Sequence, residues 1–323
     1  MTDDVASDSA NDDTGTLLRR VTETIPASLA DMRVDRVVSL IADVSRNAAA
    51  ALIESGAVTL DGAIVDAGKV KVTTGQQITV DISKVAEPEL PAAQTDLQLD
   101  VVYQDDDVIV VNKSAGLVVH PGAGNKGGTM VNYLLARYPE IAGVGDPMRP
   151  GIVHRLDAGT TGLIAVARNQ AAYESLVEQL TNRSVTRVYS AIVWGVPASL
   201  NGVIDAPIGR DQRDPTRMAV VVDGKPSRTH YAVERTFHVP KDISLVECRL
   251  ETGRTHQIRV HLASIGHPVV GDAQYGGVRA GMRAGRPMLH ARELAFDHPR
   301  TGERHTVTSE LPNDFASLVA TLS

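Results

Sequence analysis

The first quarter of the chain changes from a helical to an alternating pattern of apolar residues. Apolar residues in 34–41 recur at helical spacing, and 46–55 predicts a second helix that a glycine ends. Segments 58–65 and 77–82 have strand composition, which predicts a hairpin and a closing strand. We therefore expect 26–86 to form a compact module of two helices and a small sheet.

Two segments interrupt these patterns. Residues 1–25 are rich in Asp, Ser, Thr and Ala without sustained periodicity, which predicts a disordered acidic tail. Residues 87–96 combine prolines with small residues, which predicts a linker. The remaining part, 97–323, is expected to form one larger domain.

Strands and helices are spaced irregularly in this larger domain. Apolar runs rich in β-branched residues predict strands at 108–111, 162–167, 189–194 and 244–250. Helical patterns occupy 170–180 and 255–264. The irregular order favours an α+β fold with a mixed or antiparallel sheet over a doubly wound parallel sheet.

Charge is distributed unevenly along the chain. The formal charge of −7 argues against a nucleic-acid partner, because Lys and Arg neutralise phosphate. However, residues 1–32 carry a net −5, and the other 291 residues are nearly balanced. Residues 249–305 hold nine Arg, no Lys, five acids and six of the ten His. This surplus indicates an RNA-binding surface, since Arg pairs with phosphates and stacks on bases; locally paired surface arginines are the alternative.

The sequence argues against several common sites. Cys248 is the only cysteine, which excludes an internal disulfide or a thiolate-rich metal site and predicts a buried structural thiol. The motifs of a phosphate loop, a zinc-binding helix and a nucleophile elbow are absent. His256 and His261 are five residues apart, so on a helix they would not share a face as a metal-binding pair should. We expect no metal and no nucleotide cofactor. The lack of a long apolar run or a signal-peptide pattern predicts a cytoplasmic protein without a membrane span.

Two otherwise apolar stretches, 151–161 and 250–259, are dense in charged and small polar residues. Asp157 lies on a loop that enters a predicted strand, where a turn can present it to a cleft. In the second stretch, Thr255 has the position of a helix cap, with Arg254 aimed outward. The residues alone leave a structural ion pair and a catalytic carboxylate equally open.

Four segments, in order along the chain, resemble motifs of the RluA family of pseudouridine synthases, most closely its RluD-type branch. They lie at 110–122, 151–163, 187–191 and 250–263, and include Asn112-Lys113, His154-Arg155-Leu156-Asp157, Arg187-Val188-Tyr189 and Gly253-Arg254-Thr255-His256-Gln257-Ile258-Arg259. The resemblance implies the catalytic domain of this family and the conversion of uridine to pseudouridine in RNA.

Residues 33–82 resemble the S4 RNA-binding module that precedes the catalytic domain in this branch. Such modules usually place basic residues on the second helix, which here reads Arg46-Asn47-Ala48-Ala49-Ala50-Ala51. The module contains five basic and six acidic residues. This composition lowers the RNA affinity expected of it.

The resemblance also implies roles for individual residues. Asp157 is the catalytic carboxylate, Arg254 its basic partner, and Tyr189 stacks on an extruded uracil and assists the final removal of a proton from C5. Ile258 is an apolar wall of the pocket. The remaining candidates for substrate or RNA contact are His154, Arg155, Arg259, Asn112, Lys113 and His120.

The expected substrate is a stem-loop of large-subunit ribosomal RNA, and the same motifs also fit a transfer RNA or another ribosomal site. A rival from another class is a non-catalytic RNA-binding factor for ribosome assembly. A more distant rival is a hydrolase that uses Asp157 and a histidine. We expect the protein to act as a monomer.

Overall fold

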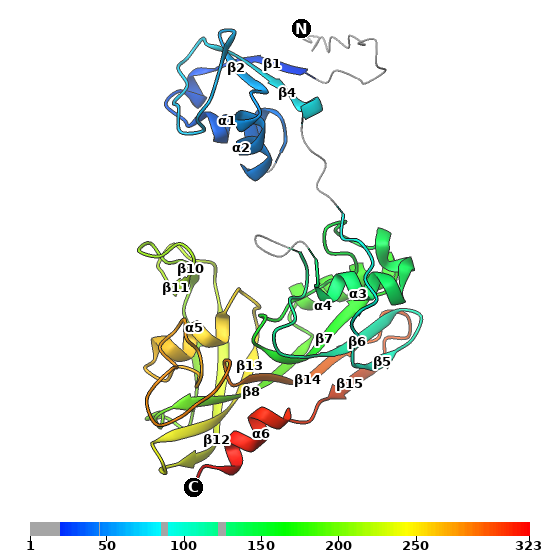
Figure 1. Cartoon of the computed structure of the whole chain (residues 1–323), viewed down its shortest axis with the longest axis vertical. Helices are drawn as coiled ribbons and strands as arrows, with labels where there is room; N and C mark the ends of the chain where they lie inside the picture. The colour runs from blue at the N-terminus through cyan, green and yellow to red at the C-terminus, as the bar shows by residue number, and fades with distance from the viewer. Residues whose placement is uncertain (1–19, 45, 85–89, 122–126) are drawn as a thin grey trace. The chain divides into compact units, whose positions relative to one another are not determined.

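The computed structural model describes residues 20–44, 46–84, 90–121 and 127–323. The chain divides into two compact units, Met1–Glu89 and Leu90–Ser323 (Figure 1). None of the helices in the described ranges is both long and apolar enough to cross a membrane.

The smaller unit packs two helices on an antiparallel sheet with strand order β1-β4-β2-β3. Its core is formed by the apolar faces of both helices and of the central strands. The predicted helices and strands are confirmed. The elements are β1 (Arg20–Thr24), η1 (Ala27–Leu29), α1 (Val34–Ile41), α2 (Arg46–Glu54), β2 (Val58–Leu60), β3 (Ala63–Ile64), β4 (Gln77–Asp81) and η2 (Ile82–Lys84).

Strand β1 corrects the predicted extent of the tail. Residues 20–24 were expected to be disordered, but they pair with the whole of β4. Four of the five β1 residues are exposed, because an edge strand faces solvent and needs few apolar side chains. The sequence pattern was therefore too weak to reveal the strand. Ile25, the last residue of the expected tail, is buried, and residues 1–19 lie outside the described residues.

The segment expected to be a linker is attached to the larger unit where it is described. Gln94 N–H donates to the carbonyl of Asn132 at 2.9 Å, and the Asn132 side chain donates to the carbonyl of Ala92 at 2.7 Å. Asn132 lies in α3 (Met130–Arg137). Residues 85–89, which include the first three residues of the expected linker, lie outside the described residues.

The larger unit is built on a nine-stranded sheet with the order β5-β6-β7-β14-β8-β13-β12-β9, and β15 pairs with β14. All these pairings are antiparallel except that of β7 with β14. A separate hairpin is formed by β10 and β11. The strands are β5 (Val101–Gln104), β6 (Val108–Lys113), β7 (Thr161–Ala167), β8 (Thr186–Trp194), β9 (Asn201–Asp205), β10 (Ile208–Arg210), β11 (Met218–Val220), β12 (Arg228–Phe237), β13 (Ile243–Leu250), β14 (Leu289–Asp297) and β15 (Arg304–Thr308).

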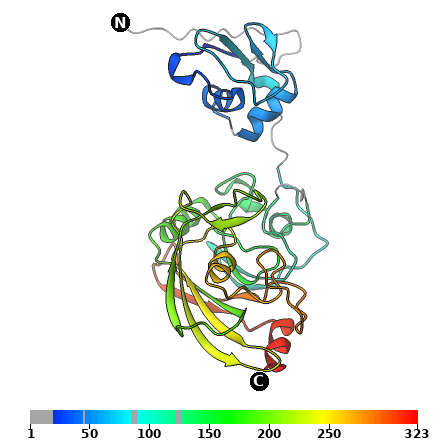
Figure 2. The same cartoon turned by 90° about the vertical axis from the view of Figure 1, so that its left-hand side faces the viewer.

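Helices cover the central strands. Every residue of β7 is buried, and so are all residues of β8 after the first, which requires cover on both faces. Helices α3 and α4 lie near β6 and β7, and α5 lies in the other half of the sheet (Figure 1). Figure 2 shows α5 on the inner side of the curved strands. The helices are α3, η3 (Pro139–Gly143), α4 (Gln170–Thr181), α5 (Gln257–Ser264) and α6 (Asn313–Ala320).

The predicted α+β fold with a mixed sheet is confirmed. Cys248 lies in β13, is fully buried and is not in a disulfide, as expected for a structural thiol. Burial raises the pKa of this thiol to about 12, so it stays protonated at neutral pH.

Candidate active site

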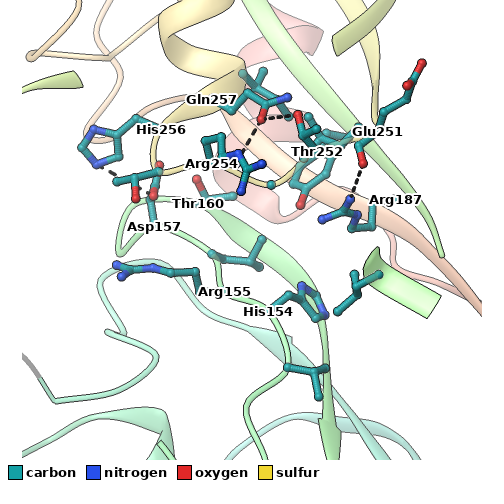
Figure 3. A pocket seen from close by; sticks show the side chains of 18 of the residues that line it. His154, Arg155, Asp157, Thr160, Arg187, Glu251, Thr252, Arg254, His256 and Gln257 are labelled. Atoms are coloured by element: carbon teal, nitrogen blue, oxygen red, sulfur yellow. Dashed lines mark hydrogen bonds and ion pairs between the residues drawn. The ribbon is translucent and has the colours of Figure 1, made fainter. Parts of the chain in front are cut away.

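Three segments that are distant in sequence line one cavity of about 530 Å³ (Figure 3). They are the loop before β7, the start of β8 and the segment from the end of β13 to the first turn of α5. Asp157 comes from the first segment, Tyr189 from the second and Arg254 and Arg259 from the third. The fold thus brings together the two charged stretches whose proximity sequence periodicity could not establish.

The start of β7 fixes the loop that carries Asp157. Gly162 has φ +108°, and a Cβ there would lie 2.2 Å from the carbonyl oxygen of Ala291 in β14. Only glycine allows this approach between the two parallel strands. Thr160 N–H donates to the Asp157 carbonyl at 3.0 Å, which closes a turn. The Asp157 side chain is 19% exposed and lines the cavity.

Arg259, on the first turn of α5, is the basic partner of Asp157. Its Nη1 lies 3.1 Å from Oδ2 of Asp157, while Nε and Nη2 donate to the two oxygens of Asp272 at 2.6 and 2.9 Å. Asp272 is fully buried. Burial disfavours the charged guanidinium, but the two carboxylates outweigh this effect and raise the pKa of Arg259. Arg259 is therefore a fixed positive charge that orients Asp157.

This geometry corrects two expectations. Arg254, expected to pair with Asp157, is exposed, and its Nε donates to the carbonyl of Pro226 at 3.4 Å. Arg259, expected to contact RNA, is buried between two carboxylates instead. Both arginines belong to one motif, and only the fold shows which of them reaches the carboxylate.

The turn before α5 also differs from the expected cap. Thr255 is not the cap, because the residue before the helix is His256. The N-cap side chain makes no capping hydrogen bond. Instead, the Gln257 side chain braces the turn before the helix, since its Oε1 accepts from the Arg254 N–H at 3.0 Å and from the Thr252 hydroxyl at 2.8 Å (Figure 3). Gln257 thereby holds the cavity-lining turn in place.

His256 faces the other oxygen of Asp157. Its backbone has φ +57°, a strained value for a residue other than glycine, and its Nε2 lies 3.8 Å from Oδ1 of Asp157. Its Nδ1 lies 2.8 Å from the Tyr275 hydroxyl, which accepts from the Met218 N–H. If the hydroxyl donates its proton to Nδ1, the ring hydrogen is on Nε2 and faces Asp157. Burial lowers the pKa of His256, although the Asp157 charge opposes this effect.

Tyr189 forms part of the buried wall of the cavity. Burial raises its pKa to about 12, with the Arg187 charge opposing and the Asp157 charge adding to the shift. A phenol that remains protonated is a poor proton acceptor at neutral pH. Ile258 lines the same cavity and is also buried, as expected for an apolar wall.

The other candidates from the two motifs before β7 have different environments. Burial and the nearby Arg187 charge lower the pKa of His154 to about 3, and its Nε2 accepts from the Ala165 N–H at 2.9 Å. A neutral histidine in this position supports the loop. Arg155 is exposed at the cavity and lies within 3.5 Å of His120. These two side chains remain available to an RNA strand.

Lys113 and Asn112 were expected to contact RNA, but both are used by the fold. The Lys113 ammonium is buried and donates to the carbonyls of Ser114, Leu117 and Ala158 at 2.9–3.1 Å. It thereby ties the residue after Asp157 to the end of β6. The Asn112 side chain donates to Asp100 at 2.9 Å and accepts from Ser309 at 3.1 Å.

A group that could hold a metal ion lies outside this cavity. In the described part of the chain, ligand atoms of Asp105, Asp107 and His298 lie within 4.8 Å of one another. Protein donors already occupy the carboxylates, since Asp107 accepts from Asn169 and Arg300 at 2.8 Å each. The group is therefore explained as a hydrogen-bond network.

Sequence reasoning missed three residues that shape the cavity: Asp272, Tyr275 and Arg187. Asp272 and Tyr275 lie in an irregular segment without periodicity, and their roles depend on contacts to α5. A lone acid after the apolar pair Val269-Val270 was the available signal, because a buried charge requires a partner. Arg187 was part of a motif but received no role of its own.

Comparison with known proteins identifies the class to which this fold and site belong. The family model of RNA pseudouridylate synthases matches residues 107–264, and that of the S4 domain matches 32–78. The chain belongs to the RNA pseudouridylate synthase family. The expected pseudouridine synthase with an S4 module is confirmed.

Similarity to individual relatives extends over almost the whole chain. An uncharacterised RNA pseudouridine synthase of Bacillus subtilis is 47% identical over 90% of this chain and 94% of its own. Ribosomal large subunit pseudouridine synthase D of Pseudomonas aeruginosa is 43% identical over 95% of this chain and 96% of its own. The solved structure of human RNA pseudouridylate synthase domain containing 1 has a TM-score of 0.55 and 32% identity, covering 70% of this chain and 88% of that chain.

The two arginines of the last motif should respond differently to substitution. Arg259→Gln should lower the rate of pseudouridine formation by about 100-fold or more, because Asp157 loses its orienting charge. Arg254→Gln should weaken RNA binding and leave kcat within about threefold. Single-turnover rates and RNA titrations separate the effects.

Arg259→Gln also leaves Asp272 buried without its partner, which costs about 3–5 kcal/mol of stability. The double variant Arg259→Gln/Asp272→Asn should therefore regain stability without regaining activity. Equal losses of kcat in Arg254→Gln and Arg259→Gln would contradict the assignment.

Lys113 should make stability depend on pH. Burial lowers its pKa from 10.5 to about 8, although the Asp157 charge opposes this shift. As the pH rises through this window, the folded protein releases a proton that the unfolded chain retains. The free energy of unfolding should therefore rise relative to that of Lys113→Met. Urea titrations between about pH 8 and pH 10.5 measure the free energy of unfolding. For the exposed control Lys225→Met, the dependence on pH should be the same as for the wild type. The same dependence for Lys113→Met would contradict the lowered pKa.

Proposed function

We propose that this enzyme converts uridine to pseudouridine in a stem-loop of large-subunit ribosomal RNA, with Asp157 as the catalytic carboxylate. The observation that carries the proposal is the pairing of Asp157 with Arg259 at the wall of a cavity large enough for a nucleotide. The proposal of a ribosomal target is supported by two relatives of this chain, from Pseudomonas aeruginosa and Vibrio vulnificus. Each of them is a ribosomal large subunit pseudouridine synthase D.

The reaction breaks the bond between C1′ and N1 and rejoins the turned base through C5. The carboxylate can attack the ribose, attack the base or abstract a sugar proton. Each route requires the charged carboxylate, which Arg259 stabilises at 3.1 Å. The target uridine must leave the RNA stack to reach Asp157, since a stacked base is inaccessible.

Tyr189 supports the extruded base by stacking. Its aromatic ring is buried in the cavity wall, and its high pKa argues for a packing role rather than proton removal. Arg155, His120 and Arg254 line the same cavity and supply contacts to the RNA around the target. The near-neutral composition of the S4 module argues that it adds less to the affinity.

The proposed reaction is an isomerisation, so it consumes no reagent and uses no metal or nucleotide cofactor. A ribosomal substrate favours a cytoplasmic location. We propose that one copy of the chain contains the complete site, because Asp157, Arg259 and Tyr189 all come from its larger unit.

The change Asp157→Asn should abolish pseudouridine formation and leave the fold and RNA binding intact, because only the charge is removed. Pseudouridines are mapped in ribosomal and transfer RNA from a deletion strain, before and after addition of purified protein. The exposed control Asp106→Asn makes the same chemical change outside the cavity and should retain activity.

The outcomes distinguish the rival functions. An active Asp157→Asn enzyme contradicts the proposed catalyst. Pseudouridine that appears only in transfer RNA shows that the substrate is a transfer RNA and not ribosomal RNA. Free uracil or a cleaved strand indicates a hydrolase. Wild-type protein that binds RNA but forms no pseudouridine indicates an assembly factor.

Tyr189 should tolerate loss of its hydroxyl but not of its ring. Tyr189→Phe keeps the stacking surface, so its rate should stay within about tenfold of wild type, whereas Tyr189→Leu should lose more. Single-turnover rates at saturating enzyme test this order. A Phe variant that is no more active than the Leu variant would show that the hydroxyl is essential.

A further inference from the structure

One buried arginine in the cavity wall has no acidic partner. Among the described residues the buried arginines are Arg187, Arg259 and Arg286, which are 7–8% exposed. Arg259 pairs with Asp157 and Asp272, and Arg286 pairs with Asp314 at 2.7 Å. No carboxylate of the described ranges lies within ion-pair distance of Arg187.

The side chain of Arg187 is only partly satisfied by the protein. Its Nη2 donates to the carbonyl of Glu251 at 3.3 Å, and its buried Nε has no hydrogen-bond partner. The turn approaches it closely, since a Cβ at Gly253 would lie 2.7 Å from Nη1. The guanidinium is therefore held in place and retains unused donors.

An unpaired buried charge is costly and requires an explanation. Burial without a compensating carboxylate lowers the pKa of Arg187, although Tyr189 opposes this effect. A purely structural arginine would be expected to have a partner such as those of Arg259 and Arg286. A buried, perturbed cation in a cavity wall is instead typical of a functional group that meets its partner in the substrate.

Arg187 is positioned beside the expected place of the base. It lies two residues before Tyr189 on β8, so both side chains project from the same face of the strand. Both line the cavity that contains Asp157. Figure 3 shows Asp157 and Arg187 on opposite sides of this cavity. A uridine with its ribose at Asp157 can thus direct its base toward Arg187.

We propose that Arg187 is a further catalytic residue, whose guanidinium binds a carbonyl oxygen of the uracil and stabilises the negative charge of the detached base. This inference rests on the proposed function, because it assumes that uridine is held at Asp157. It adds a residue that acts on the leaving base, whereas Asp157 acts at the start of the reaction.

The chemistry of the leaving base explains why a cation is needed. When the C1′–N1 bond breaks, its electron pair goes to N1 and the charge spreads to O2 and O4. The turned base then forms a bond from C5 to C1′, C5 loses a proton and N1 gains one, so the composition is unchanged. A fixed guanidinium stabilises the transient anion without taking part in proton transfer.

Burial argues for the base and against a phosphate as the ligand. The RNA backbone is charged and remains largely hydrated, so its contacts are expected at exposed arginines such as Arg155 and Arg254. Arg187 is only 7% exposed and lies against the backbone of residues 251–253. Only a group inserted into the cavity reaches it.

Arg187→Gln should lower the single-turnover rate by about 100-fold and leave the Kd for RNA within about twofold, because binding energy is lost in the transition state. Arg187→Lys, which restores the charge, should recover part of the rate. Added guanidinium ion, at a concentration that leaves the wild type folded, should raise the rate of Arg187→Ala.

Arg235→Gln is the matched control. Arg235 is exposed on β12 and does not line the cavity, so this change should leave the single-turnover rate within about threefold. Thermal melting establishes that each variant is folded. If Arg187→Gln does not fold, Arg187→Lys and the rescue of Arg187→Ala carry the test.

Three results would overturn the inference: an unchanged rate in Arg187→Gln, a loss confined to RNA affinity, or no recovery by lysine or guanidinium. Wild-type protein that forms pseudouridine normally in these assays leaves the proposed function standing in each case. Wild-type protein that forms none contradicts the proposed function itself.

Discussion

The buried ion pair between Arg259 and Asp272 is the constraint on which the active site depends. It fixes a guanidinium whose remaining Nη1 faces Asp157 at 3.1 Å. A buried arginine with two carboxylates is stable only if all three groups are held in place, so the helix that carries Arg259 and the loop that carries Asp157 must keep their relative positions. The parallel pairing of β7 with β14 supplies that rigidity on the loop side.

The cavity separates fixed charge from neutral, buried surface. Asp157 faces the fixed charge of Arg259, whereas burial lowers the pKa of His154 and raises that of Tyr189, which leaves both neutral at neutral pH. An aromatic wall and a neutral loop suit an uncharged base, and a positive side chain suits a base that becomes an anion. Arg187 is such a positive side chain, because its buried Nε has no hydrogen-bond partner and no carboxylate of the described residues pairs with it.

The smaller unit contributes the recognised S4 fold but little net charge. Several of its basic residues are paired, including Arg33 with Asp35 at 2.6 Å. The exposed arginines at the cavity therefore provide the more favourable surface for RNA phosphates.

The sequence by itself determined the α+β class, the long helices and strands, and the family, because apolar periodicity and motif spacing are local properties. It also indicated Asp157 as the candidate catalytic carboxylate. Only the tertiary structure decided that Arg259 rather than Arg254 reaches this carboxylate, that Lys113 is buried, and that Arg187 lacks a partner. Ion pairing and burial depend on segments distant along the chain, so no local pattern encodes them, and the weak edge strand β1 escaped prediction for the same reason.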